Sequence, residues 1–459
     1  MGNVLAKVTF ENNLSEGNVA KKLLKFAAPF IISNIIQSLY NVVDLIVVGW
    51  FGNRPSVAAV NNGSQLTFLA TCFAIGISVG ATVLIGQYLG AGKREELKKT
   101  IGTLIVSLTV IAAVATMLMV IFKEPLLRLI GIPEEAFSEA SDYLLVTALG
   151  TIFIFGYNAL SAIMRGMGDS KRPLIFVVIA CVTNIGLDIL FVAVFKMAAL
   201  GAAIATVIAQ AVSVVLCIIY LTKNDFIFDF KKLSSYKVDG ENFKMLFKVG
   251  FPTMIQQVAT NLSFLFLTAL ANSFGLAASS AIGIVGKFNG FAVLPAIAVS
   301  SAISAMCAQN IGAEQNERAV KTMTTGLILS YAITVPIFIL TKIFPSQILS
   351  IFGNDPDIIA EGVKYIEFFS FDYLLVPLFF CMNGLFIGSG HTTFSLVTNM
   401  ICSIFVRVPA AWIFSNYVFV GMRGLGLGAP TSTLVSCIFV VVFFFSGRWK
   451  KRVIIKKSE

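Results

Sequence analysis

Long apolar runs, separated by short polar breaks, recur along the chain from residue 24 to residue 446. Each run is long enough to cross a hydrocarbon core of about 30 Å as an α-helix, which takes about 20 apolar residues. Segments of about 10 alternating residues, typical of membrane β-barrels, do not occur. The pattern predicts twelve spanning helices, at residues 24–50, 60–89, 100–122, 137–165, 172–196, 199–222, 244–274, 279–309, 319–343, 357–388, 393–418 and 424–446.

The composition of the chain agrees with this pattern. Of the 459 residues, 57% are hydrophobic and only 13% are charged, which lies outside the range of soluble globular proteins. We therefore expect an all-α polytopic membrane protein. The polar residues 1–25 contain no short apolar core followed by a small-residue cleavage site, so we expect no cleavable signal peptide. The seven cysteines lie in apolar runs and are interpreted as small core residues.

The formal net charge of +10 is best understood from where the basic residues lie. Twelve consecutive spans place every second connecting segment, and both termini, on the same side of the membrane. Most of the 34 Lys and Arg fall in these segments, at 1–25, 93–99, 165–172, 223–248, 318–321 and 448–459. Basic residues favour the cytoplasmic side, so both termini are predicted to be cytoplasmic. The charge then reflects topology and contact with anionic membrane lipid, and we expect no nucleic-acid partner.

A polar stretch at residues 223–243 is the longest interior break, and it divides the spans six and six. We interpret it as a cytoplasmic linker. The predicted organisation is an N-lobe at residues 1–222, a C-lobe at 244–447 and a basic cytoplasmic tail at 448–459.

The two halves are copies of one another. An offset that aligns Pro29 with Pro252 continues, after one deletion, through Gln87 with Gln309, Gly90 with Gly312, Lys99 with Lys321, Gly131 with Gly353 and Tyr143 with Tyr365. Because six helices is an even number, the copies share one membrane orientation. The repeat predicts two six-helix lobes related by a pseudo-twofold axis along the membrane normal.

Four segments carry a family resemblance: "YNVVDLIVVG" in the first span, "GQYLGAGK" closing the second, "MRGMGDSKRP" after the fourth and "TNIGLDILF" in the fifth. Their order over nearly the whole chain resembles the multidrug and toxic compound extrusion (MATE) family. The resemblance implies a secondary antiporter that exports amphipathic, often cationic drugs or toxins by alternating access, in exchange for protons or sodium. It also implies a bacterial plasma membrane location and no cofactor beyond the coupling ion, and we expect a monomer.

Two buried acids in the first half are candidates for the coupling site. A charge at the centre of a spanning helix costs about 2.5–3.5 kcal/mol, so such residues are usually functional. Asp44 and Asp188 lie roughly 9 and 12 Å from the outer ends of their helices, at 1.5 Å per residue. Asn184 lies one turn before Asp188, and Thr206 on the next helix reaches a similar depth. This layer of oxygen-bearing side chains suits either a proton or sodium.

The repeat supports a functional interpretation of this layer. The second-half counterparts of Asp44, Asn184 and Asp188 are Leu267, Val406 and Ala410. A requirement of the fold should appear in both copies. The resemblance agrees, because Asp44, Asn184, Asp188 and Thr206 fall where many prokaryotic relatives have an N-lobe cation site. The seventh span reads "QQVATNLSF" and lacks the glutamate of the sodium-coupled branch.

Three further residues stand out within the spans. Asp372 and Arg407 are predicted to reach similar depths in the second half, where they could form a structural ion pair or present Asp372 to substrate. Pro29 interrupts the helix that carries Asp44, so we expect a bend there. Protonation of Asp44 or its partner would then shift the packing of this helix and lower substrate affinity.

Two other classes of function were weighed. An enzyme is not expected, because the chain has one histidine and no GxxxxGK[ST] nucleotide loop. A flippase or exporter of a lipid-linked or polysaccharide precursor is the stronger alternative. It would need a basic cavity for pyrophosphate, and only Lys287 and Arg407 are basic within the predicted spans.

Overall fold

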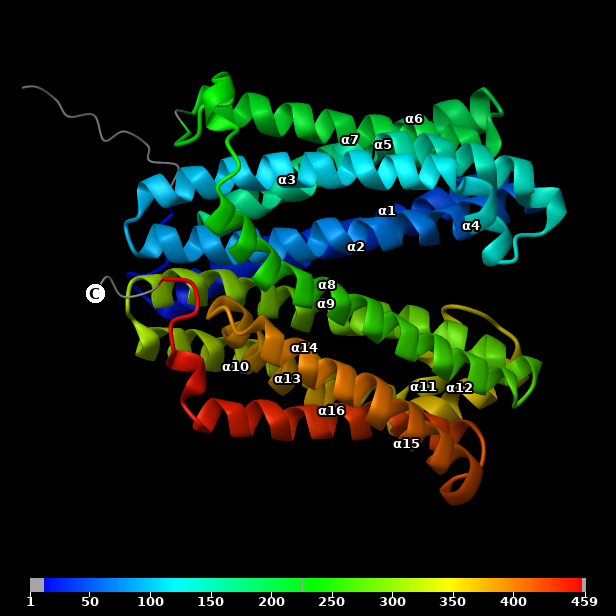
Figure 1. Cartoon of the computed structure of the whole chain (residues 1–459). Helices are drawn as coiled ribbons and strands as arrows, with labels where there is room; N and C mark the ends of the chain where they lie inside the picture. Colours follow the sequence, from blue (N-terminus) through cyan, green and yellow to red (C-terminus); the bar gives the residue numbers. More distant parts are fainter. Residues whose placement is uncertain (1–11, 225, 456–459) are drawn as a thin grey trace, which may run out of the picture. The chain divides into compact units, whose positions relative to one another are not determined.

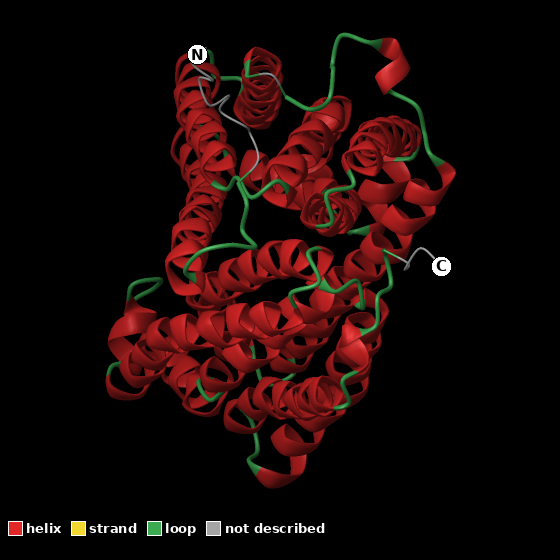
Figure 2. Ribbon diagram, turned by 90° about the vertical axis from the view of Figure 1, so that its left-hand side faces the viewer, coloured by secondary structure: helices red, strands yellow, loops and turns green. Residues whose placement is uncertain are grey.

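The computed structural model describes residues 12–224 and 226–455, and this part of the chain contains helices and loops but no strand (Figure 2). Eleven helices are long and apolar enough to cross a membrane, and a bent pair of helices makes a twelfth span. The predicted all-α polytopic membrane fold is confirmed.

Figure 1 follows the helices along the chain. The first half contains α1 (Val19–Phe51), α2 (Arg54–Gly90), α3 (Arg94–Ile121), α4 (Lys123–Leu129), α5 (Glu134–Gly166), α6 (Lys171–Asp188), the π-helix η1 (Ile189–Val194), α7 (Ala198–Lys223) and the 3₁₀ turn η2 (Leu233–Ser235). The second half contains α8 (Gly240–Asn272), α9 (Leu276–Gly312), α10 (Asn316–Ile343), α11 (Pro345–Ser350), α12 (Pro356–Phe369), α13 (Asp372–Gly388), α14 (Thr392–Met400), the π-helix η3 (Ile401–Arg407), α15 (Val408–Ile413), the π-helix η4 (Phe414–Val418), α16 (Met422–Phe445) and η5 (Arg448–Lys450).

The tenth predicted span, at residues 357–388, differs from the single straight helix that the apolar run suggests. It consists of α12 and α13, which meet at an angle of 50°. Asp372 is the first residue of α13 and therefore lies directly at this break. The backbone N–H groups of Tyr373 and Leu374 donate to the carbonyl oxygens of Ser370 and Phe371, so the chain makes tight turns at the break.

Contacts within the chain divide it into two compact units. Among the described residues, unit 1 contains those up to Leu14 and those from Ile32 to Met254, and unit 2 contains Ser15–Ile31 and those from Ile255 to residue 455. The predicted lobes at 1–222 and 244–447 differ from these units in their first helices. The start of α1 belongs to unit 2, and the start of α8 belongs to unit 1. Each change of unit lies two residues after the proline of its helix, Pro29 or Pro252.

Each unit packs around a long helix at an equivalent place in the repeat. In unit 1, α2 lies against α3 and α5, and in unit 2, its counterpart α9 lies against α10, α12 and α13. Leu127, Leu144 and Val192 are fully buried in the core of unit 1. The core of unit 2 buries Leu267, Ile366 and Leu425. Apolar side chains therefore fill both interiors, and a charged residue inside either one needs a separate explanation.

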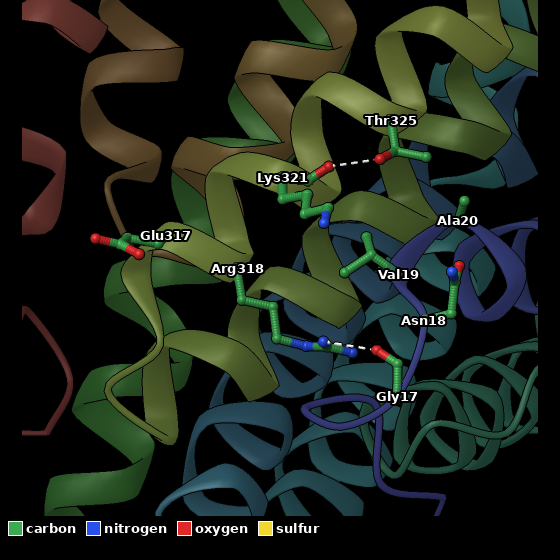
Figure 3. A pocket seen from close by; sticks show the side chains of 8 residues that line it. All are labelled: Gly17, Asn18, Val19, Ala20, Glu317, Arg318, Lys321 and Thr325. Atoms are coloured by element: carbon green, nitrogen blue, oxygen red, sulfur yellow. Dashed lines mark hydrogen bonds between the residues drawn. The ribbon is translucent and has the colours of Figure 1, made fainter.

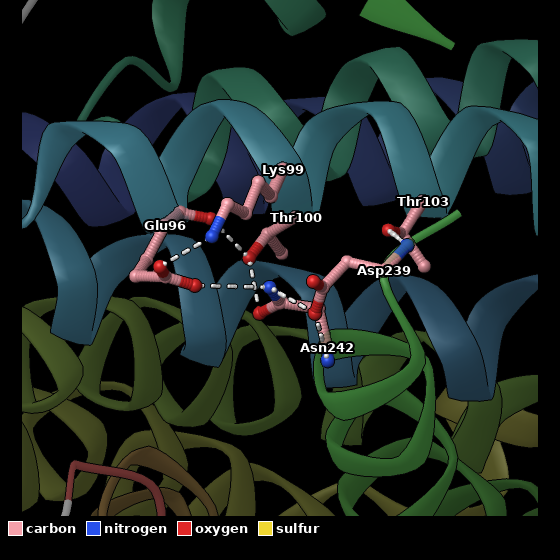
Figure 4. A network of polar contacts seen from close by, with 6 residues as sticks. All are labelled: Glu96, Lys99, Thr100, Thr103, Asp239 and Asn242. Atoms are coloured by element: carbon pink, nitrogen blue, oxygen red, sulfur yellow. Dashed lines mark hydrogen bonds and ion pairs between the residues drawn. The ribbon is translucent and has the colours of Figure 1, made fainter. Parts of the chain in front are cut away.

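The predicted linker folds onto α3 in unit 1 (Figure 4). Asp239 caps α8, because its Oδ1 accepts hydrogen bonds from the backbone N–H of Asn242 at 2.9 Å and its side-chain amide at 3.0 Å. The backbone N–H of Asp239 donates to Thr103, Thr100 donates to Asn242 Oδ1, and Asn242 Nδ2 donates to Glu96. The start of α8 is thus fixed to α3.

The basic tail, predicted at residues 448–459, packs on unit 2 where it is described. Trp449, Ile454 and Ile455 are buried, and Ile454 lies close to Gly390. Arg452 forms an ion pair of 2.5 Å with Glu314. The described part of the tail is therefore a packed segment with a basic surface.

Three glycines allow α2 and the start of α8 to approach closely within unit 1. A Cβ at Gly250 would lie 2.7 Å from Ile77 Cα and 2.8 Å from the carbonyl oxygen of Gly76. A Cβ at Gly80 would lie 2.8 Å from the carbonyl oxygen of Leu246. Small residues four apart are typical of close helix crossings in membranes. Backbone atoms cannot move aside as flexible side chains can, so this crossing requires glycine.

We expect Gly250→Ala to destabilise the protein by about 1–3 kcal/mol, because the added methyl group forces two helix backbones apart. The matched control is Gly286→Ala, whose added Cβ meets no atom within 4 Å. Alanine there should be neutral or stabilise α9 by up to about 1 kcal/mol. Thermal unfolding in detergent, followed with a thiol-reactive dye that reports buried cysteines such as Cys307, measures both variants. Equal unfolding temperatures for the two variants would contradict the assigned role of Gly250.

Candidate ion-coupling site

Two buried carboxylates share one amide in unit 1. Asp44 on α1 is 8% exposed, whereas Asn184 and Asp188, one turn apart on α6, are fully buried. One terminal atom of the Asn184 amide lies 2.7 Å from Asp44 Oδ1 and 3.0 Å from Asp188 Oδ2. Because both carboxylate oxygens are acceptors, this atom is assigned as the nitrogen, which then donates to both. The structure thus brings together three residues that the sequence singled out from two helices.

Thr206 on α7, the fourth predicted residue, lies beside Asp44. The carboxyl group of Asp44 also lies within hydrogen-bonding reach of Asp188 itself. A hydrogen bond between two carboxyl groups requires a proton on one of them. The four predicted residues therefore form one contiguous polar cluster across α1, α6 and α7.

Sequence reasoning missed two tyrosines next to this cluster. Tyr40 lies one helical turn before Asp44, and its buried hydroxyl group lies within hydrogen-bonding reach of Thr206. Tyr143 on α5 lies within electrostatic range of both acids. The spacing of Tyr40 from Asp44 was a usable signal, because residues four apart share a helix face. Tyr143 had only its repeat counterpart, Tyr365, to mark it.

A π-helix begins immediately after Asp188. Residues Ile189–Val194 form η1, which continues α6 with a wider turn. Such turns occur mostly as short insertions in α-helices, frequently at functional sites. Asp188 Oδ1 is buried without a hydrogen-bond partner. This oxygen is thus available to a proton or a bound cation.

The charge of the cluster limits what it can bind. Two ionised carboxylates this close repel each other strongly in a low-dielectric interior, and one proton or one monovalent cation relieves the repulsion. Among the described residues, no group of three or more His, Cys, Asp or Glu is placed to hold a metal ion. The cluster offers carboxyl, hydroxyl and amide groups, which suit a proton or sodium better than a transition metal.

Unit 2 has no equivalent of the acid pair. Leu267, the counterpart of Asp44, is 1% exposed and packs in the apolar core. The counterparts of Asn184 and Asp188 are Val406 and Ala410. Equivalent positions of the fold therefore carry apolar side chains in unit 2 and carboxylates in unit 1.

Asp372 and Arg407 are both buried in unit 2, at 7% and 9% exposed. Asp372 begins α13 and hydrogen bonds with Thr433 on α16. Arg407 ends η3, and its guanidinium lies 4.8 Å from the ring centroid of Phe264 on α8. The two are within electrostatic range, but the ion pairs found among the described residues do not include one between them. The ion pair was one of two interpretations drawn from depth alone, and depth does not fix which way a side chain points.

Two cavities lie within unit 2, and neither is lined by the acid pair. One, of about 350 Å³, lies between the start of α1 and α10, where Arg318 donates hydrogen bonds to the backbone oxygens of Glu16 and Gly17 (Figure 3). The other, of about 460 Å³, is apolar and lies between α8 and α15. Its lining includes Leu267, Val408 and Trp412.

Comparison with known proteins identifies the family to which this architecture belongs. The model of the MatE family matches residues 29–190 and again 252–413, in agreement with the internal repeat. The probable multidrug resistance protein YoeA of Bacillus subtilis is 30% identical over 96% of each chain. An FAD transporter of Shewanella oneidensis is 22% identical over 94% of this chain and 96% of its own.

The fold agrees with solved structures as well. A structure described as the outward-facing conformation of a multidrug resistance MATE family transporter has a TM-score of 0.88 and 23% identity. It covers 95% of this chain and 96% of that chain. Because the family model covers both halves and the relatives align end to end, the chain belongs to the MatE family of multidrug efflux transporters and not to a family of enzymes.

Proposed function

We propose that the protein is a secondary antiporter that exports amphipathic, often cationic compounds in exchange for a proton, with sodium as the alternative ion. The observation that carries the proposal is the amide of Asn184 shared by Asp44 and Asp188. A site of two carboxylates and one donor has two charge states, with or without a bound cation. Coupling needs such a pair of states.

In this mechanism the Asp44–Asp188 pair takes up one cation from outside and releases it inside. Asn184 holds both carboxylates in place, and Thr206 adds a hydroxyl oxygen beside Asp44. Uptake of the cation removes one negative charge from the interior of unit 1. A cationic substrate is then held less well, so that ion entry accompanies substrate release.

Helix α1 is the element that would transmit this change. It carries Asp44 in its unit 1 part and Pro29 shortly before the point where its contacts change unit. Proline removes a backbone hydrogen bond and weakens the helix locally. We propose Pro29 as the bending point at which a change of charge at Asp44 alters the helix.

The remaining expectations complete the proposal. The chain acts as a monomer in a bacterial plasma membrane, with both termini cytoplasmic and its basic loops in contact with anionic lipid. The alternative, a flippase or exporter of a lipid-linked or polysaccharide precursor, gains some support from the FAD transporter, because FAD carries a pyrophosphate. Against it, Arg407 is a single buried cation and not the basic cavity that a pyrophosphate requires.

The coupling ion can be tested with purified protein in liposomes, by measuring ethidium efflux under an imposed pH gradient and then under a sodium gradient. Asp44→Asn and Asp188→Asn should each reduce driven efflux at least about tenfold, because an amide cannot exchange a proton or neutralise sodium. Asp142→Asn is the matched control, since Asp142 is exposed in the same unit. Wild-type rates in both site variants, or no dye movement under either gradient, would contradict the proposal and favour the flippase.

Linkage gives a second test that needs no gradient. If a proton at the Asp44–Asp188 pair weakens dye binding, then by reciprocity dye binding must release a proton, and affinity must fall on acidification. We expect both effects in wild-type protein and in Asp142→Asn, and neither in Asp44→Asn or Asp188→Asn. Equilibrium dye binding over a pH series, with proton release recorded in weak buffer, measures them. Proton uptake on dye binding would have the wrong sign for antiport. Competition by sodium at constant pH would identify the other ion.

A further inference from the structure

Arg407 is a buried cation with two nitrogen atoms that have no hydrogen-bond partner. Its Nε and Nη1 atoms are both buried in unit 2 and neither donates to any group there. The guanidinium remains charged in proteins and carries five N–H donors. Its described contact is through its face, with the ring of Phe264 at 4.8 Å. The ring stabilises the charge through a cation–π contact, but this contact does not use the N–H groups in the plane of the guanidinium.

The surroundings of Arg407 contain other unpartnered polar atoms. Asp372 Oδ1 and the hydroxyl group of Tyr373 are likewise buried without hydrogen-bond partners. Tyr365 lies within electrostatic range of both Asp372 and Arg407. Buried polar groups are nearly always hydrogen-bonded, so a cluster with donors and acceptors both unsatisfied points to a polar ligand or to water between them. A purely structural arginine would be expected to pair with Asp372, which it does not.

Aromatic rings belong to the same part of unit 2. The rings of Phe369 and Tyr373 lie 5.8 Å apart, and those of Tyr365 and Phe369 lie 5.1 Å apart. The apolar cavity of about 460 Å³ between α8 and α15 is lined by Val408, the residue that follows Arg407, and not by Arg407 or by these rings. The unpartnered donors of Arg407 therefore lie in a part of unit 2 that is rich in aromatic rings.

We propose that Arg407 binds the carboxylate of an amphoteric aromatic substrate, with Asp372 on the side of its cationic group. This inference rests on the proposed function and specifies one substrate class for it. A guanidinium binds a planar carboxylate well, because both present parallel hydrogen-bonding groups. A phosphate dianion fits less well, because Asp372 lies within electrostatic range of the single arginine. A purely cationic compound would leave Arg407 unsatisfied.

The test compares two dyes that differ in one group: rhodamine 110, which has a free carboxylate, and rhodamine 123, its methyl ester. Equilibrium binding to purified protein is measured by fluorescence polarisation. Arg407→Gln should weaken rhodamine 110 at least about tenfold and rhodamine 123 less than about threefold, because the ester offers no charged acceptor. Arg407→Lys should recover part of the loss. Arg423→Gln is the matched control, since Arg423 is exposed and pairs with Glu367 on the surface of unit 2.

Wild-type protein alone provides a second measurement, in case Arg407→Gln does not fold. Benzoate should displace rhodamine 110 and spare rhodamine 123, whereas benzamide should displace neither selectively. Equal effects of Arg407→Gln on both dyes, or displacement by benzoate and benzamide alike, would overturn the carboxylate subsite. Binding of rhodamine 123 alone would also overturn it.

The outcomes separate this inference from the antiport mechanism. If rhodamine 123 is exported in an Asp44-dependent manner and rhodamine 110 shows no dependence on Arg407, the subsite is refuted and antiport stands. If carboxylate selectivity depends on Arg407 but Asp44→Asn and Asp188→Asn transport as wild type, the subsite stands and the coupling site is refuted.

Discussion

The burial of two carboxylates against one amide is the constraint on which the rest of the structure depends. In a lipid-spanning bundle, water cannot screen the repulsion between Asp44 and Asp188, so the pair must be neutralised by a proton or cation, or opened to solvent. Asn184 makes the pair tolerable by donating to both acids. A network in which every polar atom had a hydrogen-bond partner would have no free atom to bind a proton or cation. The free oxygen of Asp188 leaves this one incomplete, and therefore able to change state.

The backbone near the pair is also less regular than in an ordinary helix. Asp188 directly precedes a π-helix, and Asp44 shares α1 with Pro29. Both features remove or displace backbone hydrogen bonds, which lowers the cost of a local change in helix shape. Elsewhere the packing is tight, as at the crossing of Gly76, Gly80 and Gly250. Rigid crossings within a unit, combined with weakened helices at the acids, direct any movement to α1 and α6.

The sequence predicted the spans and singled out the two acids because both depend on local chemistry. Apolar length marks a span, and a carboxylate such as Asp188 inside one stands out without knowledge of its neighbours. The other features depend on how the helices pack against one another, which the sequence does not show. Hydropathy does not say which helices a segment contacts, so the change of unit within α1 and α8 was not foreseen. Depth does not give direction, so the sequence left open whether Asp372 pairs with Arg407 or faces substrate, and it did not show the 50° break that places Asp372 at a helix start.

The two repeats carry different charged residues at their centres. Where unit 1 has Asp44 and Asp188, unit 2 has Leu267 and Ala410. The same alignment pairs Arg407 and Asp372 of unit 2 with Ile185 and Gly150 of unit 1.

One aromatic position is kept in both copies. Tyr143 lies within electrostatic range of the acid pair, and its counterpart Tyr365 lies within range of Arg407 and Asp372. A duplicated scaffold thus keeps its tyrosine and changes the charges around it. One copy is left with an excess of negative charge that a cation can satisfy, and the other with unpaired donors that a carboxylate can satisfy. In the proposed mechanism the driving ion and part of the substrate therefore bind at different polar centres, and the two are coupled by a change of affinity and not by competition for the same contacts.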